Sequence, residues 1–193
     1  LEQRQGSGRG DSIIAFGCEG RRYDSLYLMP GAARKKIHHV ALGATADGLA
    51  AVTRNALAAG LQLEAAAVDF ASRGIWVRNP HGLLFHVEDC DPEATLAEEP
   101  EFRINSPGHF NRVNAIVMPP KSQIRDPRPR KLGHVLLFTP DVHQSIDFLT
   151  GVLGMRLSDR SEDVVAFTHC QGGSDHHVIA LAKSSGIGFH HAS

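Results

Sequence analysis

The sequence predicts an α+β protein assembled from repeated βαβββ modules. Three observations lead to this fold class. Segments near the start of the chain recur near its end, the segment after the first histidine pair has the order strand, helix, strand, strand, and a proline-rich stretch divides the chain. Internal repetition of this kind indicates a fold built by duplicating one supersecondary unit.

The repeat is visible as short matched segments in the same order. Ile14 to Phe16 recurs as Val165 to Phe167, 151 positions later. Ile37 to His39 recurs as Phe189 to His191, 152 positions later. A further strand-like segment is repeated between these anchors, with Ser25 to Leu28 matching Val178 to Leu181. We therefore expect the same strands, in the same order, near both ends of the chain.

The segment after the first histidine pair reads as one β-α-β-β unit. Residues 40–42 form a short apolar strand, and residues 46–59 have apolar side chains at helical spacing with Gly60 as the stop signal. Residues 74–77 and 83–87 are predicted to pair as a hairpin around the turn sequence Asn79-Pro80-His81-Gly82.

A second unit is expected after the proline-rich stretch. Residues 133–138 form its first strand, residues 142–153 an amphipathic helix, and a further strand begins at Gly154. Prolines at 119, 120, 127 and 129 exclude a helix or a central strand there. We therefore place a domain at 1–118, partial at its start, a linker at 119–130, and a second domain at 131–193.

Composition limits the classes of function. The net charge of −1 and the pI of about 6.9 give no basic field for nucleic acid or an acidic membrane. No apolar run approaches the ~20 residues that span a bilayer, so no membrane partner is expected. The three cysteines, Cys18, Cys90 and Cys170, are far apart and odd in number, which favours reduced thiols in a cytoplasmic protein.

Histidine is the residue type that suggests chemistry. There are 12 histidines, and three adjacent pairs occur at 38–39, 176–177 and 190–191. Neutral imidazole is the commonest side-chain metal ligand, so this richness favours a metal site. Taken alone, a single strand histidine such as His134 is more simply explained by a hydrogen bond to a backbone carbonyl.

Several segments after the proline-rich stretch form a recognisable set. They are Lys131 to Leu137, Pro140-Asp141, Phe148 to Met155, His176 to Leu181 and His190-His191. Together they resemble the vicinal oxygen chelate superfamily and, within it, the type I extradiol ring-cleavage dioxygenases. The resemblance runs from Arg128 to Ser193, and more weakly from Ile13 to Pro92. It implies that residues 131–193 open the catalytic domain and that residues 1–118 form the non-catalytic domain of a two-domain fold.

The resemblance also implies a site. His134 and His191 would be two ligands of Fe(II), with Mn(II) as a second option, and His177 would act on substrate and oxygen as an acid/base group. The third ligand of this family, a Glu on a later strand, would lie after Ser193, so the catalytic domain is expected to be truncated. The implied partners are a small aromatic diol, such as a 2,3-dihydroxybiphenyl-like compound, and O₂, in a homo-oligomer.

Alternatives remain at several positions. Strand alternation sends His190 and His191 to opposite faces, so only one of them can bind a metal, and His176 competes with His177. The pair His38-His39, with His86, could form a second site, although a decayed site kept for packing is the better interpretation. In function, the alternatives are a metal-free or differently metallated binding protein and a glyoxalase-type lyase or isomerase.

Overall fold

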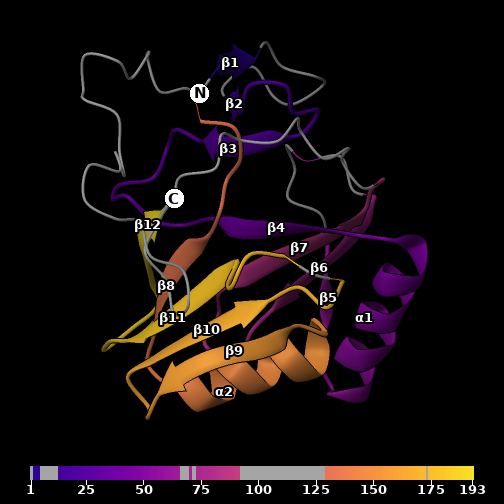
Figure 1. Cartoon of the computed structure of the whole chain (residues 1–193), viewed down its shortest axis with the longest axis vertical. Coiled ribbons are helices and arrows are strands. Elements are labelled where there is room, and N and C mark those ends of the chain that lie inside the picture. Colours follow the sequence, from indigo (N-terminus) through magenta and orange to yellow (C-terminus); the bar gives the residue numbers. More distant parts are fainter. Residues whose placement is uncertain (1, 5–12, 66–69, 71–72, 92–128, 173) are drawn as a thin grey trace, which may run out of the picture.

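The computed structural model describes residues 2–4, 13–65, 70, 73–91, 129–172 and 174–193. The chain folds into two βαβββ units, an added strand and a small amino-terminal sheet (Figure 1). The first unit forms a four-stranded sheet in the order β4-β7-β6-β5. Its elements are β4 (His39–Ala44), α1 (Ala46–Ala58), β5 (Leu63–Glu64), β6 (Gly74–Arg78) and β7 (Leu84–Asp89).

The second unit repeats this topology. Its strands have the order β8-β11-β10-β9, with β8 and β11 parallel as β4 and β7 are in the first unit. The added strand β12 pairs antiparallel with β8 and forms an edge of the sheet. The elements are β8 (Val135–Thr139), α2 (Val142–Asp147), η2 (Phe148–Val152), β9 (Arg156–Ser161), β10 (Val165–His169), β11 (Ile179–Lys183) and β12 (Gly188–Ala192). The expected β-α-β-β order is confirmed.

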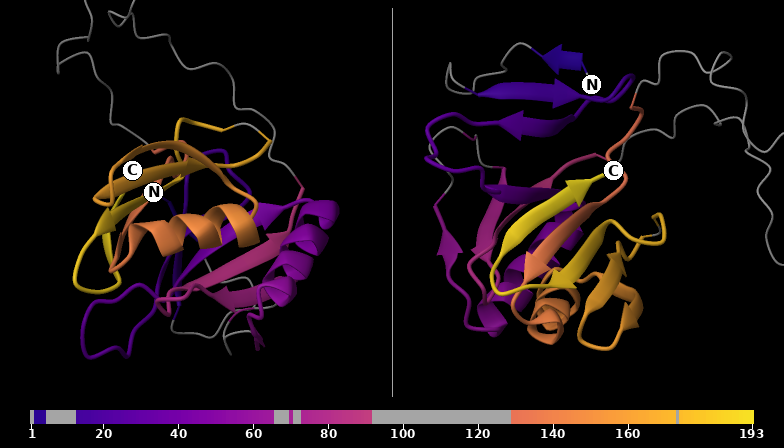
Figure 2. Two further views of the ribbon diagram at one scale, coloured as in Figure 1. Left: turned by 90° about the horizontal axis from the view of Figure 1, so that it is seen from below. Right: turned by 90° about the vertical axis from the view of Figure 1, so that its left-hand side faces the viewer.

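Three strands near the amino terminus form a separate antiparallel sheet, β1-β2-β3, which lies above the two units (Figure 2). They are β1 (Glu2–Arg4), β2 (Ile14–Gly17) and β3 (Asp24–Leu28). The β2–β3 hairpin corresponds to the β10–β11 hairpin, as the sequence repeat predicts. The turn of the β2–β3 hairpin is tied to the chain before β8, because Glu19 N donates to Pro129 O and Arg21 Nε to Arg130 O.

Local sequence explains where the elements begin and end. Thr45 caps α1 by accepting a hydrogen bond from Gly48 N, and Gly60, with φ of 72°, follows its last turn. In the β6–β7 turn, the side-chain oxygen of Asn79 accepts hydrogen bonds from the backbone N–H groups of His81 and Leu83. The turn chemistry read from the sequence is therefore present.

The second helix differs from the expectation of one continuous α-helix over 142–153. Asp141 caps α2 by accepting from Gln144 N at 2.9 Å, but the helix continues as a π-helical turn, η2. Leu153 N bonds to Phe148 O, five residues back, rather than to the carbonyl four residues back. The wider turn buries Phe148, Leu149 and Val152 together.

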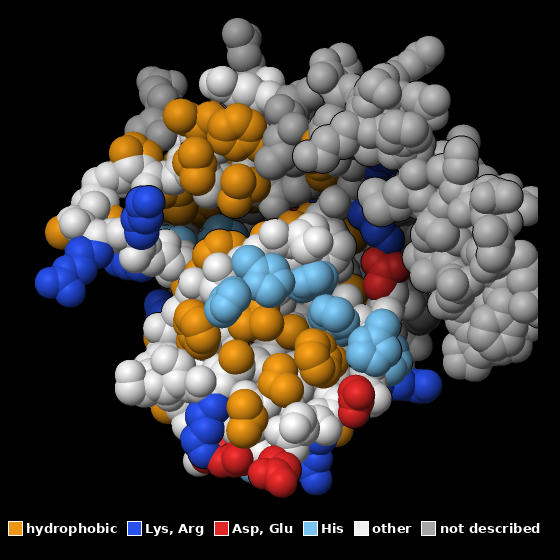
Figure 3. Space-filling view, turned by 60° about the vertical axis from the view of Figure 1, so that its left-hand side comes forward, with side chains coloured by type: hydrophobic (Ala, Val, Ile, Leu, Met, Phe, Trp, Pro, Cys, Tyr) orange, Lys and Arg blue, Asp and Glu red, His pale blue; other side chains and the backbone are white. Residues whose placement is uncertain are grey.

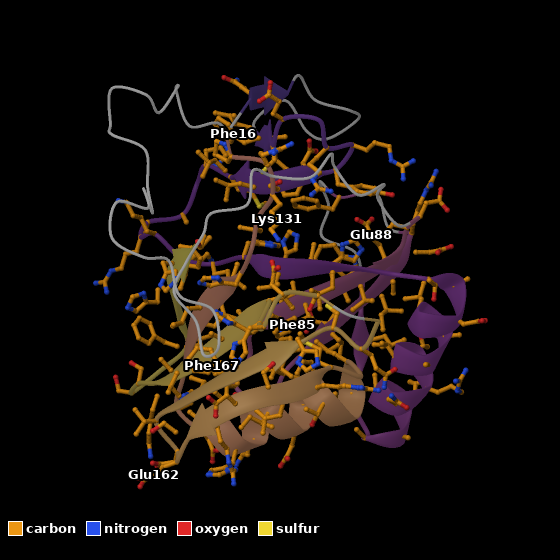
Figure 4. The ribbon with its side chains drawn as sticks, in the orientation of Figure 1. Phe16, Phe85, Glu88, Lys131, Glu162 and Phe167 are labelled. Carbon is orange, nitrogen blue, oxygen red and sulfur yellow. The ribbon has the colours of Figure 1, made fainter. Side chains whose placement is uncertain are left out.

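The two units share one apolar core. Residues of α1, β6 and β7 pack with residues of β8, α2, η2 and β11, and the rings of Phe85 and Phe148 lie 5.3 Å apart across the junction. Figure 4 shows Phe85 in the interior and Glu162 at the tip of the β9–β10 turn. Most of the expected linker, residues 119–128, lies outside the described residues, so the domain boundaries stay a prediction.

A second, smaller cluster closes the first unit against the amino-terminal sheet. Phe70, Trp76 and Leu84 are buried in it, with Tyr27 of β3 packed against them.

Across the described parts of the chain, no helix combines the length and apolarity needed to cross a membrane. The three cysteines, all described, form no disulfide, and burial raises the pKa of the Cys90 and Cys170 thiols, so these two stay protonated.

Candidate functional site

The antiparallel pairing of β8 and β12 brings His134 and His191 together. His134 immediately precedes β8, and its backbone continues the ladder through hydrogen bonds with Ser193. His191 lies opposite Leu136 in the same ladder. The Nε2 atoms of the two imidazoles are 3.0 Å apart, and both residues are half-buried. Residues 57 positions apart in sequence thus present the same ring atom to one point.

This separation matches the geometry of two ligands on one ion. An imidazole nitrogen binds a first-row divalent ion at about 2.1 Å, and two neighbouring positions of an octahedron then lie about 3.0 Å apart. The separation between the Nε2 atoms of His134 and His191 therefore fits such a pair. Within the described part of the chain, no group of three or more His, Cys, Asp or Glu side chains is placed to hold a metal. A third ligand has to come from elsewhere.

The strict alternation expected for His190 and His191 is not observed. The β8–β12 register shifts between Phe189 and His191, which places a β-bulge at this point. The His190 ring contacts Phe138 at 5.2 Å, while the His191 ring contacts His134. The extra residue of the bulge lets both imidazoles reach one face of β8. The expectation that they point to opposite faces is therefore wrong, although only His191 meets His134.

His177 lies beside the His134–His191 pair, in the segment that leads into β11. Its ring is 4.4 Å from that of His134, whereas the ring of His176 packs against Phe167. Partial burial lowers the pKa of His177, and the neighbouring imidazoles of His134 and His176 lower it further. The neutral imidazole, which can accept a proton, is thus the favoured form at neutral pH.

Aromatic side chains of β8 and β10 adjoin the histidines. Figure 3 shows a band of histidines across one face with hydrophobic side chains next to it. Phe167 contacts His177 at 4.9 Å, and Phe138 contacts His190. The sequence marked Phe167 only as part of the repeat. Its neighbourhood with His177 depends on the path of residues 170–178, which no local pattern predicts.

The corresponding place in the first unit is filled. His39-Val40 there matches His134-Val135, and the parallel strand pairs then align His86 with Ala180. His86 stacks on Trp76 with ring centroids 4.2 Å apart, and His39 packs edge-on against Trp76 and Phe70. At the matching position of the second unit, Phe167 is paired with Ala180, so a methyl group stands where the first unit has the ring of His86. This filling supports the packing interpretation of His38, His39 and His86.

Comparison with known proteins finds a family that matches this part of the chain. The family model "Glyoxalase/Bleomycin resistance protein/Dioxygenase superfamily" matches residues 131–191, the segment that carries all three site histidines. This segment of the chain is therefore similar to members of that superfamily. Over 120 residues the chain is 45% identical to Metapyrocatechase 2 of Cupriavidus necator, which covers 62% of this chain and 36% of that protein. The chain thus spans about a third of the length of this relative.

Solved structures show the same fold. A Mn(II)-bound glyoxalase from Novosphingobium aromaticivorans superposes with a TM-score of 0.67 at 23% identity, covering 100% of this chain and 56% of that one. The 2,3-dioxygenase LapB from Pseudomonas sp. KL28 gives a TM-score of 0.65 at 23% identity, covering 96% of this chain and 63% of that one. Solved structures with this fold thus include a glyoxalase and a 2,3-dioxygenase.

Proposed function

We propose that the protein is an extradiol-type dioxygenase that opens the aromatic ring of a catechol-type substrate with O₂. The observation that carries the proposal is the 3.0 Å separation of the His134 and His191 Nε2 atoms, with His177 next to them. The 45% identity to a metapyrocatechase over 120 residues supports ring cleavage over the other chemistries of this fold.

His134 and His191 would hold Fe(II), or Mn(II), together with a carboxylate from outside the described residues. Two imidazoles and one carboxylate would leave room on the ion for the two diol oxygens and O₂. When bound, the ion supplies a template and a redox relay between the diol and O₂. Residues 131–193 would then be the opening part of the catalytic domain, and the filled first unit would belong to a supporting domain.

His177 would be the acid/base group. Its neutral imidazole stands beside His134, so it can accept a proton from a diol hydroxyl and return it to a developing oxygen anion. Phe167 and Phe138 would provide apolar contacts for the aromatic ring.

The test is anaerobic reconstitution of the full native protein with Fe(II), followed by addition of catechol or 2,3-dihydroxybiphenyl and then air. We expect a yellow ring-cleavage product that requires both the metal and O₂. Metal-free protein and the His134→Ala variant serve as controls. Substrate binding without product would favour a binding protein, and isomerisation of a hemithioacetal without ring cleavage would favour a glyoxalase-type enzyme. Either result would contradict the proposal.

A further inference from the structure

The proposed role of His177 raises the question of what holds this side chain in place. His177 lies between β10 and β11, in residues 170–178, where the described residues form no helix or strand. Its Nδ1 atom is 3.1 Å from that of the adjacent His176, which is itself exposed. The side chain is therefore not fixed by its own strand. Apart from its own ring contacts with His134 and Phe167, its position depends on the contacts of the residues just before and after it.

The residue two positions before His177 is held by an ion pair. Lys131 Nζ lies 2.6 Å from Asp175 Oδ2, and both side chains are about half exposed. Lys131 is three residues before His134, so the ion pair joins the segment that carries one site histidine to the segment that carries the other. Figure 4 shows Lys131 in the stretch that leads down to β8. Ser174 adds a local link, because its hydroxyl accepts from Cys170 N.

The residue immediately before His177 is held by a side chain of β9. The hydroxyl of Ser158, on β9, donates a hydrogen bond to the backbone carbonyl of His176. Ser158 Oγ is also 2.6 Å from Nδ1 of His169, on β10. A hydroxyl has one proton, so while Ser158 donates to the carbonyl the imidazole of His169 donates to Ser158. A chain of two hydrogen bonds thus connects the sheet to the backbone at His176.

After His177, the chain is fixed by the sheet itself. Val178 N donates to Thr168 O at 2.8 Å, and Val135 N donates to Val178 O at 3.0 Å. The second bond connects the residue after His177 to the residue after His134. The backbone is therefore restrained on both sides of His177, and the restraints before it come from two side chains, Lys131 and Ser158.

We propose that Lys131 and Ser158 are positioning residues that hold His177 against the His134–His191 pair, Lys131 through Asp175 and Ser158 through the carbonyl of His176. Their contacts are with the Asp175 carboxylate and the His176 carbonyl, so both act through residues 175–176. The inference rests on the proposed function for its meaning in catalysis. Its structural content, the placement of the His177 ring, is independent of that function.

The chain offers matched controls for both residues. Lys183 forms an ion pair with Asp163 whose side chains are exposed to 48% and 47%, close to the 50% and 52% of Lys131 and Asp175. Lys183 is at the end of β11, away from His177, so Lys183→Gln removes the same charge without touching the site. Ser161 lies on β9 like Ser158 and is exposed, which makes Ser161→Ala the control for Ser158→Ala.

The experiment uses the full native protein and two readouts. The first is the ¹H–¹³C spectrum of the histidine rings, with the His177 signal assigned by its loss in His177→Ala. The second is kcat for catechol cleavage at saturating substrate, with bound iron measured in parallel. Lys131→Gln and Ser158→Ala should each shift or broaden the His177 signal and lower kcat about two- to fivefold, the range open to a half-exposed contact. The double variant should lose roughly tenfold or more.

Bound iron should stay at about one ion per chain in these variants, because both ligands remain. Lys131→Arg, which keeps the charge, should retain the wild-type signal and kcat. Lys183→Gln and Ser161→Ala should change neither. An unchanged His177 signal in both Lys131→Gln and Ser158→Ala would overturn the inference, as would equal effects in the controls. If Lys131→Gln does not fold, Asp175→Asn breaks the same ion pair from its other end.

Failure of this inference and failure of the proposed function are distinguishable. If the wild-type protein with iron cleaves no catechol, the function is wrong, and the histidine spectrum alone still decides whether the two residues position His177. If the wild type is active and the two variants keep full kcat, the positioning role is wrong while the function stands.

Discussion

Removing each site histidine in turn separates a metal ligand from an acid/base group. His134→Ala and His191→Ala each delete one Nε2 atom of the pair that lies 3.0 Å apart. One imidazole and the proposed carboxylate would hold the ion only weakly, so iron should be lost on gel filtration. His177→Ala deletes a ring that lies beside the pair without being part of it. Bound iron should then stay near the wild-type level.

The size of the kinetic effect follows from the role. A positioned acid/base group contributes about 10²-fold or more to a rate, which corresponds to about 2.7 kcal/mol of transition-state stabilisation. His177→Ala should therefore lower kcat by roughly 10²-fold with little change in iron content. His143, which is exposed on α2, supplies the matched control, and His143→Ala should leave both quantities unchanged.

The pH dependence gives a second readout of the same variant. Burial and neighbouring imidazoles lower the pKa of His177, and the neutral ring is the form that accepts a proton. Activity should be present above this pKa and fall as the pH drops through it, at a pH below the ordinary histidine value of about 6.5. The acid limb should disappear in His177→Ala. Equal iron loss in the His134, His177 and His191 variants would refute the assignment of roles.

Two further predictions concern stability. Phe148→Ala should lower the free energy of unfolding by about 3–5 kcal/mol, because the ring is 3% exposed. If the two units share one core, a double-mutant cycle with Phe85, measured by urea titration, should show a coupling energy of roughly 0.5–1.5 kcal/mol. Additive effects of the two substitutions would contradict that shared core. Asp141→Ala should lower the free energy of unfolding by about 1 kcal/mol in the same titration, because it removes the cap of α2. Asp147, which is exposed, provides the control, and an equal loss in Asp147→Ala would contradict the capping role of Asp141.

The sequence predicts the elements well because their signals are local. The apolar spacing and Gly60 mark α1, and Asn79 with Gly82 marks the β6–β7 turn, where the structure has them. The π-turn after Asp147 was not predicted. Its helical spacing looks like that of an α-helix, and the wider turn is selected by the burial of Phe148 and its neighbours in the shared core. Sequence spacing alone does not contain that packing information.

The same contrast between local sequence signals and long-range contacts applies to the site. The repeat and the family resemblance bring His134, His177 and His191 to notice, and the structure places them together. The bulge at His190 was missed because alternation is only the default behaviour of a strand, and a register shift is settled by its partner strand. Lys131 and Ser158 were missed as well. They look like ordinary surface residues, and their partners are 44 and 18 positions away.

The place of His191 on an edge strand has a mechanical consequence. β12 is paired only with β8 among the described strands, so the distance between the two imidazoles depends on the alignment of a single ladder. A slip of two residues would keep His191 on its face but move it by about 7 Å along the strand. An ion bound by both rings would therefore cross-link β8 and β12 and stabilise this alignment of the two strands over every other one. Removal of the ion should then loosen β12 first, which hydrogen exchange of its backbone amides would report.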